Sequence, residues 1–416
     1  MYNAMTYVPA VMFSHFGVYC TDIDRLEDFY MRVLGFAISD AGLVGGGAAK
    51  MTFMTRRPRE HHQFVLGSGR DINDPTTVNQ VGFKAPDLTE LRRIHAILEN
   101  EPEANDVVVV NHGISWSLYF RDAEGIRSVI SVETPWYVPQ PVCWPLDLSQ
   151  SDADIMRDTE DKCRTTEGFV MRSDWRAAKK KEYIGDGRLT LEGNPTGNAS
   201  PDFAAPVFQD RTLLEMRGDE APRIAMSHVG MAAIDLPALT SFYTDVLGYA
   251  ITGQGRMPAI GAEPERDYVY LSRDPGEHQQ VVLCDGRAAD TPSSINQLSL
   301  RITTLDELRH MEAILTADDR VKGYRYTCHG NSFSIYFSDP EDNWVELAVE
   351  SVWYVPAPEG WTLDLSLDNA ALIADTEKRV REIPGFLMRA DWKAKARDEL
   401  IALGKLEAEG LVSDVA

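Results

Sequence analysis

The sequence predicts an α+β protein assembled from four copies of one βαβββ unit. The first observation is a repeat at constant spacing: SLYFRDAEG at 117–125 recurs as SIYFSDPED at 334–342, and WYVPQP at 136–141 recurs as WYVPAP at 353–358. Both pairs are offset by 217 positions (334 − 117 = 353 − 136). The second observation is a weaker repeat inside each half, where a strand pattern precedes a helix pattern and three shorter strand patterns. The chain is therefore predicted to be a tandem duplication.

Each half opens with the same two elements and repeats them once. SHFGVYC at 14–20 and SHVGMAA at 227–233 are strand patterns, and each precedes a helix pattern that ends in VLG. NQVGF at 79–83 and NQLSL at 296–300 begin the second unit of each half, followed by apolar residues at i, i+3, i+4 and i+7. We expect the two units of one half to pair with each other.

The domain boundaries follow from these repeats. We predict an N-terminal module at 12–133, a helical extension and linker at 134–205, a C-terminal module at 225–350 and a C-terminal helical extension at 351–416. Gly, Pro, Asn and Ser concentrate in GNPTGNASPDFAAP at 193–206, which is a linker composition.

The bulk composition restricts the class of protein. At 416 residues the chain is too long for one core of ordinary size, and 44% hydrophobic residues is typical of a globular protein. A net charge of −23 argues against a nucleic-acid partner, because phosphate binding needs clustered Lys and Arg. No apolar run approaches the roughly 18 residues of a membrane helix, so no membrane partner is expected.

The cysteines and the first residues bear on location and assembly. Five cysteines without CxxC spacing fit reduced thiols, so we expect no disulfide, and residues 1–15 lack the pattern of a signal peptide. These observations predict a cytoplasmic protein. The apolar, Trp-rich and Pro-rich segments that begin at Trp136 and Trp353 favour a homo-oligomer, because they can pack across subunits.

Several motifs resemble the vicinal oxygen chelate superfamily, which includes glyoxalases, bleomycin resistance proteins and extradiol dioxygenases. FY followed by VLG occurs in the first helix pattern of each half, and the second half carries a late signature of His329, Tyr336 and Glu346. Asp342 departs from that signature, since Gly or Pro is usual there. Among the members, the chain is most similar to the two-module extradiol ring-cleavage dioxygenases.

The resemblance implies a curved, cup-like mixed sheet in each module, with a metal bound inside the cup. Its ligand positions, one on the first strand of each unit and one on the last strand, correspond here to His228, Gln297 and Glu346. Gln297 stands where a second histidine is usual, and an amide oxygen suits harder divalent ions. We expect a divalent metal, Fe(II) for oxygen chemistry, with Mn(II) or Zn(II) as alternatives.

The N-terminal module differs from this pattern at the carboxylate. His15 and Gln80 correspond to the first two ligand positions, but Val129 stands where the glutamate would be. One imidazole and one amide hold a dication poorly, so this module is predicted to be structural. The adjacent His61 and His62 leave open a second site there.

Three side chains are candidates for catalysis. His329 is suited to moving a proton at neutral pH, and Tyr336 can donate a hydrogen bond to a substrate oxygen. His278 lies where the resembling enzymes carry a His-His pair, one member of which acts as acid and base, but here its neighbour is Gln279. The alternative for Tyr336 is a half-buried strand aromatic, and for His278 a solvated turn histidine.

Three functions are compatible with these residues. The leading hypothesis is a metal-dependent extradiol-type dioxygenase that cleaves a catechol-like or hydroquinone-like ring with dioxygen. The first alternative is a non-oxidative isomerase, lyase or hydrolase that uses the metal as a Lewis acid. The second is a non-catalytic protein that binds an aromatic ligand.

Overall fold

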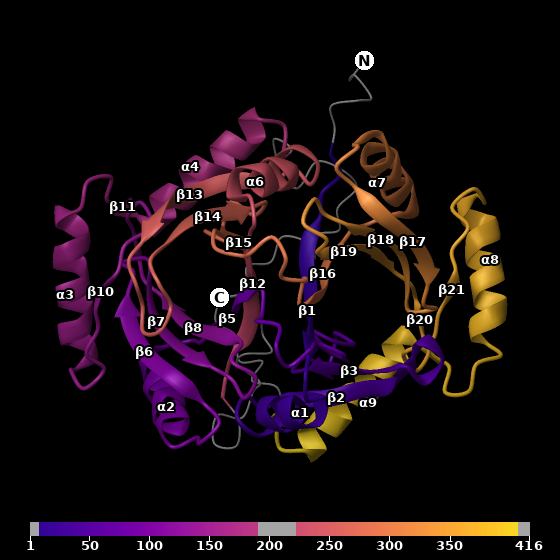
Figure 1. The fold of residues 1–416 in the computed structure, drawn as a ribbon, viewed down its shortest axis with the longest axis horizontal. Coiled ribbons are helices and arrows are strands. Elements are labelled where there is room, and N and C mark those ends of the chain that lie inside the picture. Colours follow the sequence, from indigo (N-terminus) through magenta and orange to yellow (C-terminus); the bar gives the residue numbers. More distant parts are fainter. Residues whose placement is uncertain (1–7, 190–221, 407–416) are drawn as a thin grey trace, which may run out of the picture.

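The strands form two curved mixed sheets that lie side by side, with helices on their outer faces (Figure 1). The computed structural model describes residues 8–189 and 222–406, so the predicted linker at 193–206 lies outside the described residues. Sheet A has the strand order β2-β3-β4-β1-β16-β19-β18-β17-β21, and sheet B has the order β10-β6-β7-β8-β5-β12-β15-β14-β13. The predicted α+β class with paired βαβββ units is confirmed.

The four units have the predicted succession of elements. Unit 1 consists of β1 (Met12–Cys20), α1 (Ile23–Arg32), β2 (Ala37–Val44), β3 (Ala49–Thr55) and β4 (Phe64–Ser68). Unit 2 consists of β5 (Val78–Lys84), α2 (Leu88–Glu99), β6 (Asn105–Asn111), β7 (Ser115–Arg121) and β8 (Arg127–Glu133). Unit 3 consists of β12 (Ala225–Ala232), α6 (Leu236–Asp245), β13 (Ala250–Met257), β14 (Arg266–Ser272) and β15 (Val281–Cys284). Unit 4 consists of β16 (Ile295–Arg301), α7 (Leu305–Ala317), β17 (Lys322–Cys328), β18 (Ser332–Ser338) and β19 (Trp344–Glu350).

Each half ends in an extension of short strands and two helices. The first extension consists of β9 (Trp136–Tyr137), β10 (Trp144–Pro145), α3 (Asp152–Thr165), β11 (Val170–Met171) and α4 (Arg172–Gly185). The second extension consists of β20 (Trp353–Tyr354), β21 (Trp361–Thr362), α8 (Asn369–Val380), β22 (Leu387–Met388) and α9 (Arg389–Ala402). Strand β10 pairs with β6 of sheet B and β21 pairs with β17 of sheet A, so each extension adds a strand to a different sheet.

The units pair across the two halves of the chain. In sheet A, β1 of unit 1 pairs antiparallel with β16 of unit 4, and in sheet B, β5 of unit 2 pairs antiparallel with β12 of unit 3. The expectation that units pair within 12–133 and within 225–350 is therefore wrong. The connections at 69–77 and 285–294 run from one sheet to the other. The first strands of the four units have similar alternating apolar patterns, so the pattern alone does not determine which two of them pair.

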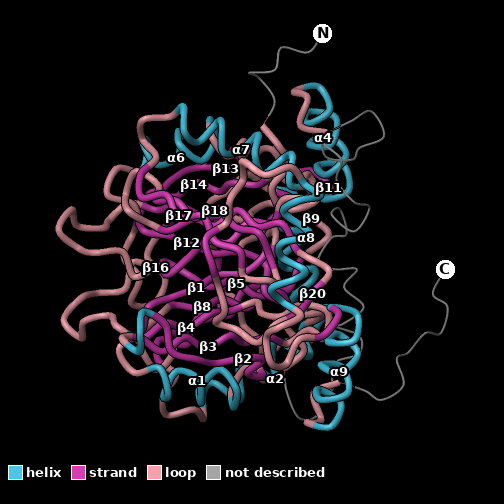
Figure 2. Tube along the Cα trace, turned by 90° about the vertical axis from the view of Figure 1, so that its right-hand side faces the viewer, coloured by secondary structure: helices cyan, strands magenta, loops and turns pink. Residues whose placement is uncertain are grey.

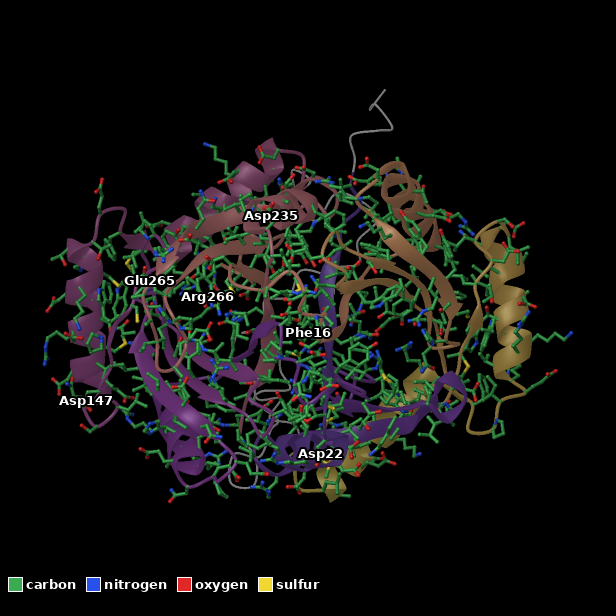
Figure 3. All side chains as sticks on the ribbon, in the orientation of Figure 1. Phe16, Asp22, Asp147, Asp235, Glu265 and Arg266 are labelled. Carbon is green, nitrogen blue, oxygen red and sulfur yellow. The ribbon has the colours of Figure 1, made fainter. Side chains whose placement is uncertain are left out.

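Alternation along the first strands separates an apolar face from a polar face. Phe16 is fully buried and belongs, with Val229 and Leu298, to the main hydrophobic core, and it lies centrally between the two sheets in Figure 3. Successive side chains of a strand point to opposite faces, so His15 and Gly17 face the other way, into the hollow of sheet A. The hydrophobic core thus fixes which residues reach the concave side.

The helices cover two opposite sides of the strand layer. Figure 2 shows α6 and α7 along one side and α1 and α2 along the other. Each of these four helices is preceded by an N-cap residue whose side chain accepts a hydrogen bond from a backbone N–H of the first turn. The N-cap residues are Asp22, Asp87, Asp235 and Thr304. Among the described residues, no helix is long and apolar enough to cross a membrane.

The Trp-rich extensions pack within their own chain. Trp175 stacks on Tyr137 with ring centroids 4.9 Å apart, and Trp392 stacks on Tyr354 at 5.2 Å. Each stack joins the second helix of an extension to the first short strand of the same extension. Homo-oligomerisation stays a prediction, as does cytoplasmic location. All five cysteines are free thiols, which confirms the prediction that none forms a disulfide.

Candidate metal centre in sheet A

Four polar side chains form a continuous row across the concave face of sheet A. His15 on β1 is the register partner of Ser299 on β16, Ser299 is the partner of Glu346 on β19, and Glu346 is the partner of Tyr336 on β18. Directly paired residues project to the same face of a sheet. The ten-residue interval from Tyr336 to Glu346 therefore places both in one hollow, as predicted. We call the hollow that contains this row the A cup.

The row and Gln297 converge on one point. His15 Nε2 lies 3.1 Å from Glu346 Oε2, and the Gln297 amide nitrogen lies 2.6 Å from the same His15 Nε2. Ser299 Oγ donates to Glu346 Oε2 at 2.6 Å. His15, Gln297 and Glu346 are 6%, 8% and 2% exposed, so three polar groups are held together out of bulk water. Burial on this scale needs a compensating charge or hydrogen bond for every group.

The Glu346 carboxylate is held in its ionised form. Burial alone would raise its pKa, but hydrogen bonds from His15 and Ser299 and the electrostatic effect of the two neighbouring imidazoles lower the pKa well below its usual range. A carboxylate that is ionised and buried presents a concentrated negative charge inside the A cup. That charge is the strongest attraction for a cation in the site.

The geometry of these groups fits a divalent metal ion. Donor atoms about 2.1 Å from an ion and at right angles to one another lie about 3 Å apart, which is close to the separations around His15 Nε2. Rotating the Gln297 side-chain amide by half a turn would present its oxygen in place of its nitrogen. Within residues 8–189 and 222–406, no three His, Cys, Asp or Glu side chains form a metal-binding group. A metal bound beside His15 and Glu346 would take the oxygen of this amide as a third protein donor.

His329 and Tyr336 form a hydrogen-bonded pair beside these donors. His329 Nδ1 donates to the carbonyl oxygen of Glu359 at 2.8 Å, which leaves Nε2 to accept the Tyr336 hydroxyl at 3.0 Å. Burial lowers the pKa of His329, and burial together with the Glu346 charge raises the pKa of Tyr336 well above its usual value. The imidazole is therefore a neutral acceptor and the phenol a persistent donor.

Two adjacent histidines of unit 1, His61 and His62, also lie at the A cup. The His62 ring meets the His15 ring edge to face at a centroid distance of 4.0 Å, and burial lowers the pKa of His62 well below its usual value. Behind it, His61 Nδ1 lies 2.7 Å from His62 Nδ1, and His61 Nε2 lies 2.6 Å from Asp40 Oδ2. A chain from Asp40 through His61 to His62 thus ends beside the candidate metal ligands.

His228 does not join the predicted ligand set. It lies on β12 in sheet B, where its Nε2 is 3.0 Å from the Gln80 amide nitrogen and 3.1 Å from that of Gln279. The set His228, Gln297 and Glu346 is therefore wrong as a group, because cross-half pairing brings β1 and not β12 beside β16. His15 takes the place that had been assigned to His228.

The hollow of sheet B carries the same row, but the serine and the glutamate are replaced by non-polar residues. In place of Ser299, Glu346 and Tyr336, the partners that follow His228 are Gly82, Val129 and Tyr119. A Cβ on Gly82 would come within 2.2 Å of the His228 ring, so the glycine leaves room for the imidazole. We call this hollow the B cup. With no carboxylate in its row, it lacks the charge that a metal site needs.

His278 also lies in sheet B, away from Glu346. Its ring is 5.0 Å from the Tyr270 ring and 6.0 Å from the Trp175 ring, and burial lowers its pKa to about 4. The predicted catalytic role beside Gln297 and Glu346 is wrong for this residue, because strand β15 and the turn before it belong to the other sheet. The equivalent position in sheet A is His61, which is followed by His62 and not by a glutamine.

A family model for the Glyoxalase/Bleomycin resistance protein/Dioxygenase superfamily matches residues 12–128. These residues form a domain of that superfamily. The superfamily domain spans units 1 and 2, so it contributes His15 and His62 to the A cup and Gln80 to the B cup. No curated protein sequence matches the chain.

Solved structures that match the chain include both glyoxalases and dioxygenases. Glyoxalase I from Zea mays has 12% sequence identity over 82% of this chain and 92% of its own, with a TM-score of 0.44. A putative dioxygenase from Bacillus subtilis subsp. subtilis str. 168 has 11% identity over 97% and 99%, with a TM-score of 0.46. The 2,3-dioxygenase LapB from Pseudomonas sp. KL28 has 15% identity over 84% and 95%, with a TM-score of 0.28.

Sequence reasoning assigned His15 to a structural module and left His62 without a role. The repeat contained a signal that could have placed them. The second histidine of the pair occurs in unit 1 and not in unit 3, and the glutamate Glu346 occurs in unit 4 and not in unit 2. Pairing of units 1 and 4 puts both differences in one cup.

Proposed function

We propose that the chain is a metal-dependent dioxygenase that cleaves a catechol-like or hydroquinone-like aromatic ring in the A cup. The observation that carries this proposal is the convergence of His15, Gln297 and Glu346 next to the hydrogen-bonded His329 and Tyr336. Three donors on one face leave the remaining positions of an ion open for other ligands. The flanking imidazole and phenol supply the proton-transfer groups that a dihydroxyaromatic substrate needs.

His15, Gln297 and Glu346 would hold the metal. When bound, a divalent ion such as Fe(II) would lower the pKa of a coordinated hydroxyl and supply the redox chemistry for dioxygen. The buried Glu346 contributes the negative charge of the site, and Ser299 fixes its orientation through a hydrogen bond of 2.6 Å.

His329 is placed to accept a proton from a substrate hydroxyl. Its lowered pKa keeps the ring neutral near pH 7, and the Glu359 carbonyl fixes the tautomer so that Nε2 is the free base. The Tyr336 hydroxyl would turn from His329 to a negatively charged substrate oxygen and donate a hydrogen bond to it. Arg325, whose guanidinium lies 4.2 Å from the Tyr336 ring centroid, favours negative charge nearby.

His62 is the group placed to exchange protons on the other side of the ligand trio. Asp40 accepts hydrogen bonds from the Tyr354 hydroxyl at 3.0 Å and from the backbone N–H of Ala357 at 2.9 Å, in addition to its contact with His61. This rigid carboxylate orients His61, and His61 in turn orients His62. A pocket opens beside His15, His61 and His62, which gives these rings a route to solvent.

The second candidate function is a non-oxidative enzyme that uses the metal as a Lewis acid. Gln297 favours it, because a neutral amide oxygen suits harder ions such as Mn(II) and Zn(II) better than a second imidazole would. In that case His329 and His62 would move protons within one substrate. Dioxygen would then not be consumed.

The experiment compares metals and oxygen in one purified protein. After anaerobic loading with Fe(II), addition of catechol or hydroquinone followed by air is expected to consume dioxygen and produce a coloured ring-cleavage product. Glu346→Ala should remove the activity, and His228→Gln, the matched change in the B cup, should preserve it. Absence of oxygen uptake with every dihydroxyaromatic compound tested would exclude the dioxygenase, and turnover with Mn(II) or Zn(II) without oxygen would support the second candidate.

A further inference from the structure

A pocket opens inside the B cup and is lined by side chains of β5, β7, β8, β12, β13 and β14. Its walls combine tyrosine rings and aliphatic side chains with a few polar groups, including Tyr119, Tyr268, Tyr270, Met257, Ile260 and Arg127. The rings of Tyr268 and Tyr270 are nearly parallel, with an interplanar angle of 17° and centroids 6.2 Å apart. Flat aromatic walls of this kind suit a flat ligand.

Arg127 is the exceptional group in this hollow. The residue is 2% exposed, and its guanidinium carbon lies 4.0 Å from the Tyr119 ring centroid. Its Nε and Nη2 atoms have no hydrogen-bond partner, and over residues 8–189 and 222–406 it forms no ion pair with a carboxylate. A buried guanidinium normally pairs with an anion, because an uncompensated buried charge is costly.

The A cup shows how the corresponding charge is balanced. There the arginine over the equivalent tyrosine is Arg325, which is exposed, and the anion Glu346 belongs to the protein. In the B cup the arginine is buried and Val129 replaces the glutamate. The B cup therefore contains a buried cation whose counter-ion is not supplied by its own row.

The geometry points to the B cup as a metal-independent binding site for a small aromatic carboxylate, with the carboxylate on Arg127 and the ring against Tyr268 and Tyr270. A guanidinium and a carboxylate form two parallel hydrogen bonds, which would use both unpartnered nitrogen atoms of Arg127. The neighbouring amide of Gln80 and the pair formed by His112 and Tyr119 add neutral polar contacts. This site is independent of any chemistry in the A cup.

Calorimetric titration of the full chain with benzoate tests the site, with benzamide as the neutral ligand of the same shape. We expect benzoate to bind and benzamide to bind at least about tenfold more weakly, since charge-assisted pairs are the stronger ones. Arg127→Met should lower the affinity of the protein for benzoate by a similar factor. Arg325→Met, the matched change in the A cup, should leave the benzoate affinity unchanged.

A crystal structure of the wild-type protein with benzoate locates the ligand without any variant. The carboxylate is expected within hydrogen-bond distance of Arg127 Nη2. If benzoate does not bind at about 10 mM, a concentration well above the Kd expected for a small-molecule site, the proposal is overturned. It is also overturned by a ligand elsewhere in the crystal, by equal affinities for benzoate and benzamide, or by an Arg127→Met protein that binds benzoate as the wild type does. None of these results depends on dioxygenase activity.

Discussion

His15 Nε2 and Glu346 Oε2 lie 3.1 Å apart, although the two residues come from opposite halves of the chain. The contact exists because β1 pairs with β16, and β16 pairs with β19. The same strand pairing in sheet B joins His228 to Val129 through Gly82. Two rows with one geometry and different side chains provide matched controls inside one molecule.

Metal content should respond to His15 and not to His228. His15→Gln removes a strong donor next to Glu346, so metal bound after loading and desalting is expected to fall from about one ion per chain to well below one. His228→Gln should leave about one ion per chain, because its row has no carboxylate. Elemental analysis of both variants makes the comparison. Equal loss in the two would contradict the assignment of the site to the A cup.

Val129→Glu should create a second metal site in the B cup. The new carboxylate would occupy the register position of Glu346, beside His228 and Gln80, whose side-chain nitrogens are already 3.0 Å apart. Metal content is expected to rise from about one to about two ions per chain. Val129→Gln, which has the same shape without charge, is the control. A metal content that stays near one in both variants would show that the row alone is insufficient.

Turnover should depend on Tyr336 much more than on Tyr119. Tyr336→Phe removes a hydrogen-bond donor to the substrate oxygen, so we expect kcat to fall by about a hundredfold with little change in KM. Tyr119→Phe breaks the equivalent bond to His112 in the B cup and should leave kcat unchanged. Steady-state assays of the metal-loaded wild type and of both variants measure kcat and KM for this comparison. Similar losses in both would mean that the tyrosines serve packing and not catalysis.

Stability should fall as the pH is lowered below about 6.5, and His278 should contribute to that loss. Burial lowers the pKa of His278 to about 4, so between pH 6.5 and 4 the unfolded chain binds a proton at this residue and the folded chain does not. Stability therefore rises with pH across this window and is lost on acidification. Each such histidine contributes on the order of 1 kcal/mol per pH unit, and His228 and His112, with pKa values of about 3 and 4, act in the same direction.

Denaturant unfolding of His278→Leu at pH 8 and pH 5 measures this contribution. The difference in the free energy of unfolding between the two pH values should be smaller in the variant by about 1 to 2 kcal/mol. The measurement at pH 8, where the histidine is neutral in both states, isolates any change in packing. An unchanged difference would mean that His278 takes up a proton in the folded protein.

The elements of this fold were predictable from the sequence, because each depends on residues close together in the chain. Alternation in SHFGVYC and helical spacing after Asp22 each need only local neighbours, and the cap by Asp22 satisfies a backbone N–H within its own turn. The interval from Tyr336 to Glu346 also belongs to one hairpin. These predictions agree with the structure for that reason.

The pairing of units could not be predicted in the same way. Strands β5 and β16 share the sequence Asn-Gln followed by a similar apolar pattern, so the sequence pattern does not distinguish them as partners of β1. The contact of Asp40 with His61 was likewise invisible, because it depends on the register between β2 and the turn before β4. Identical local patterns carry no information about which copy is the partner.

The interlaced connectivity of the two sheets has a consequence for how the cups can change. If two identical two-unit chains formed such a structure as a symmetric pair, every substitution would be present in both cups at once. In a single continuous chain, the residue at the end of unit 4 can be glutamate while its counterpart at the end of unit 2 is valine. Because the halves are covalently joined, the residues of one cup can be substituted independently of those of the other. The loss of a carboxylate in the B cup therefore leaves the candidate metal ligands of the A cup in place.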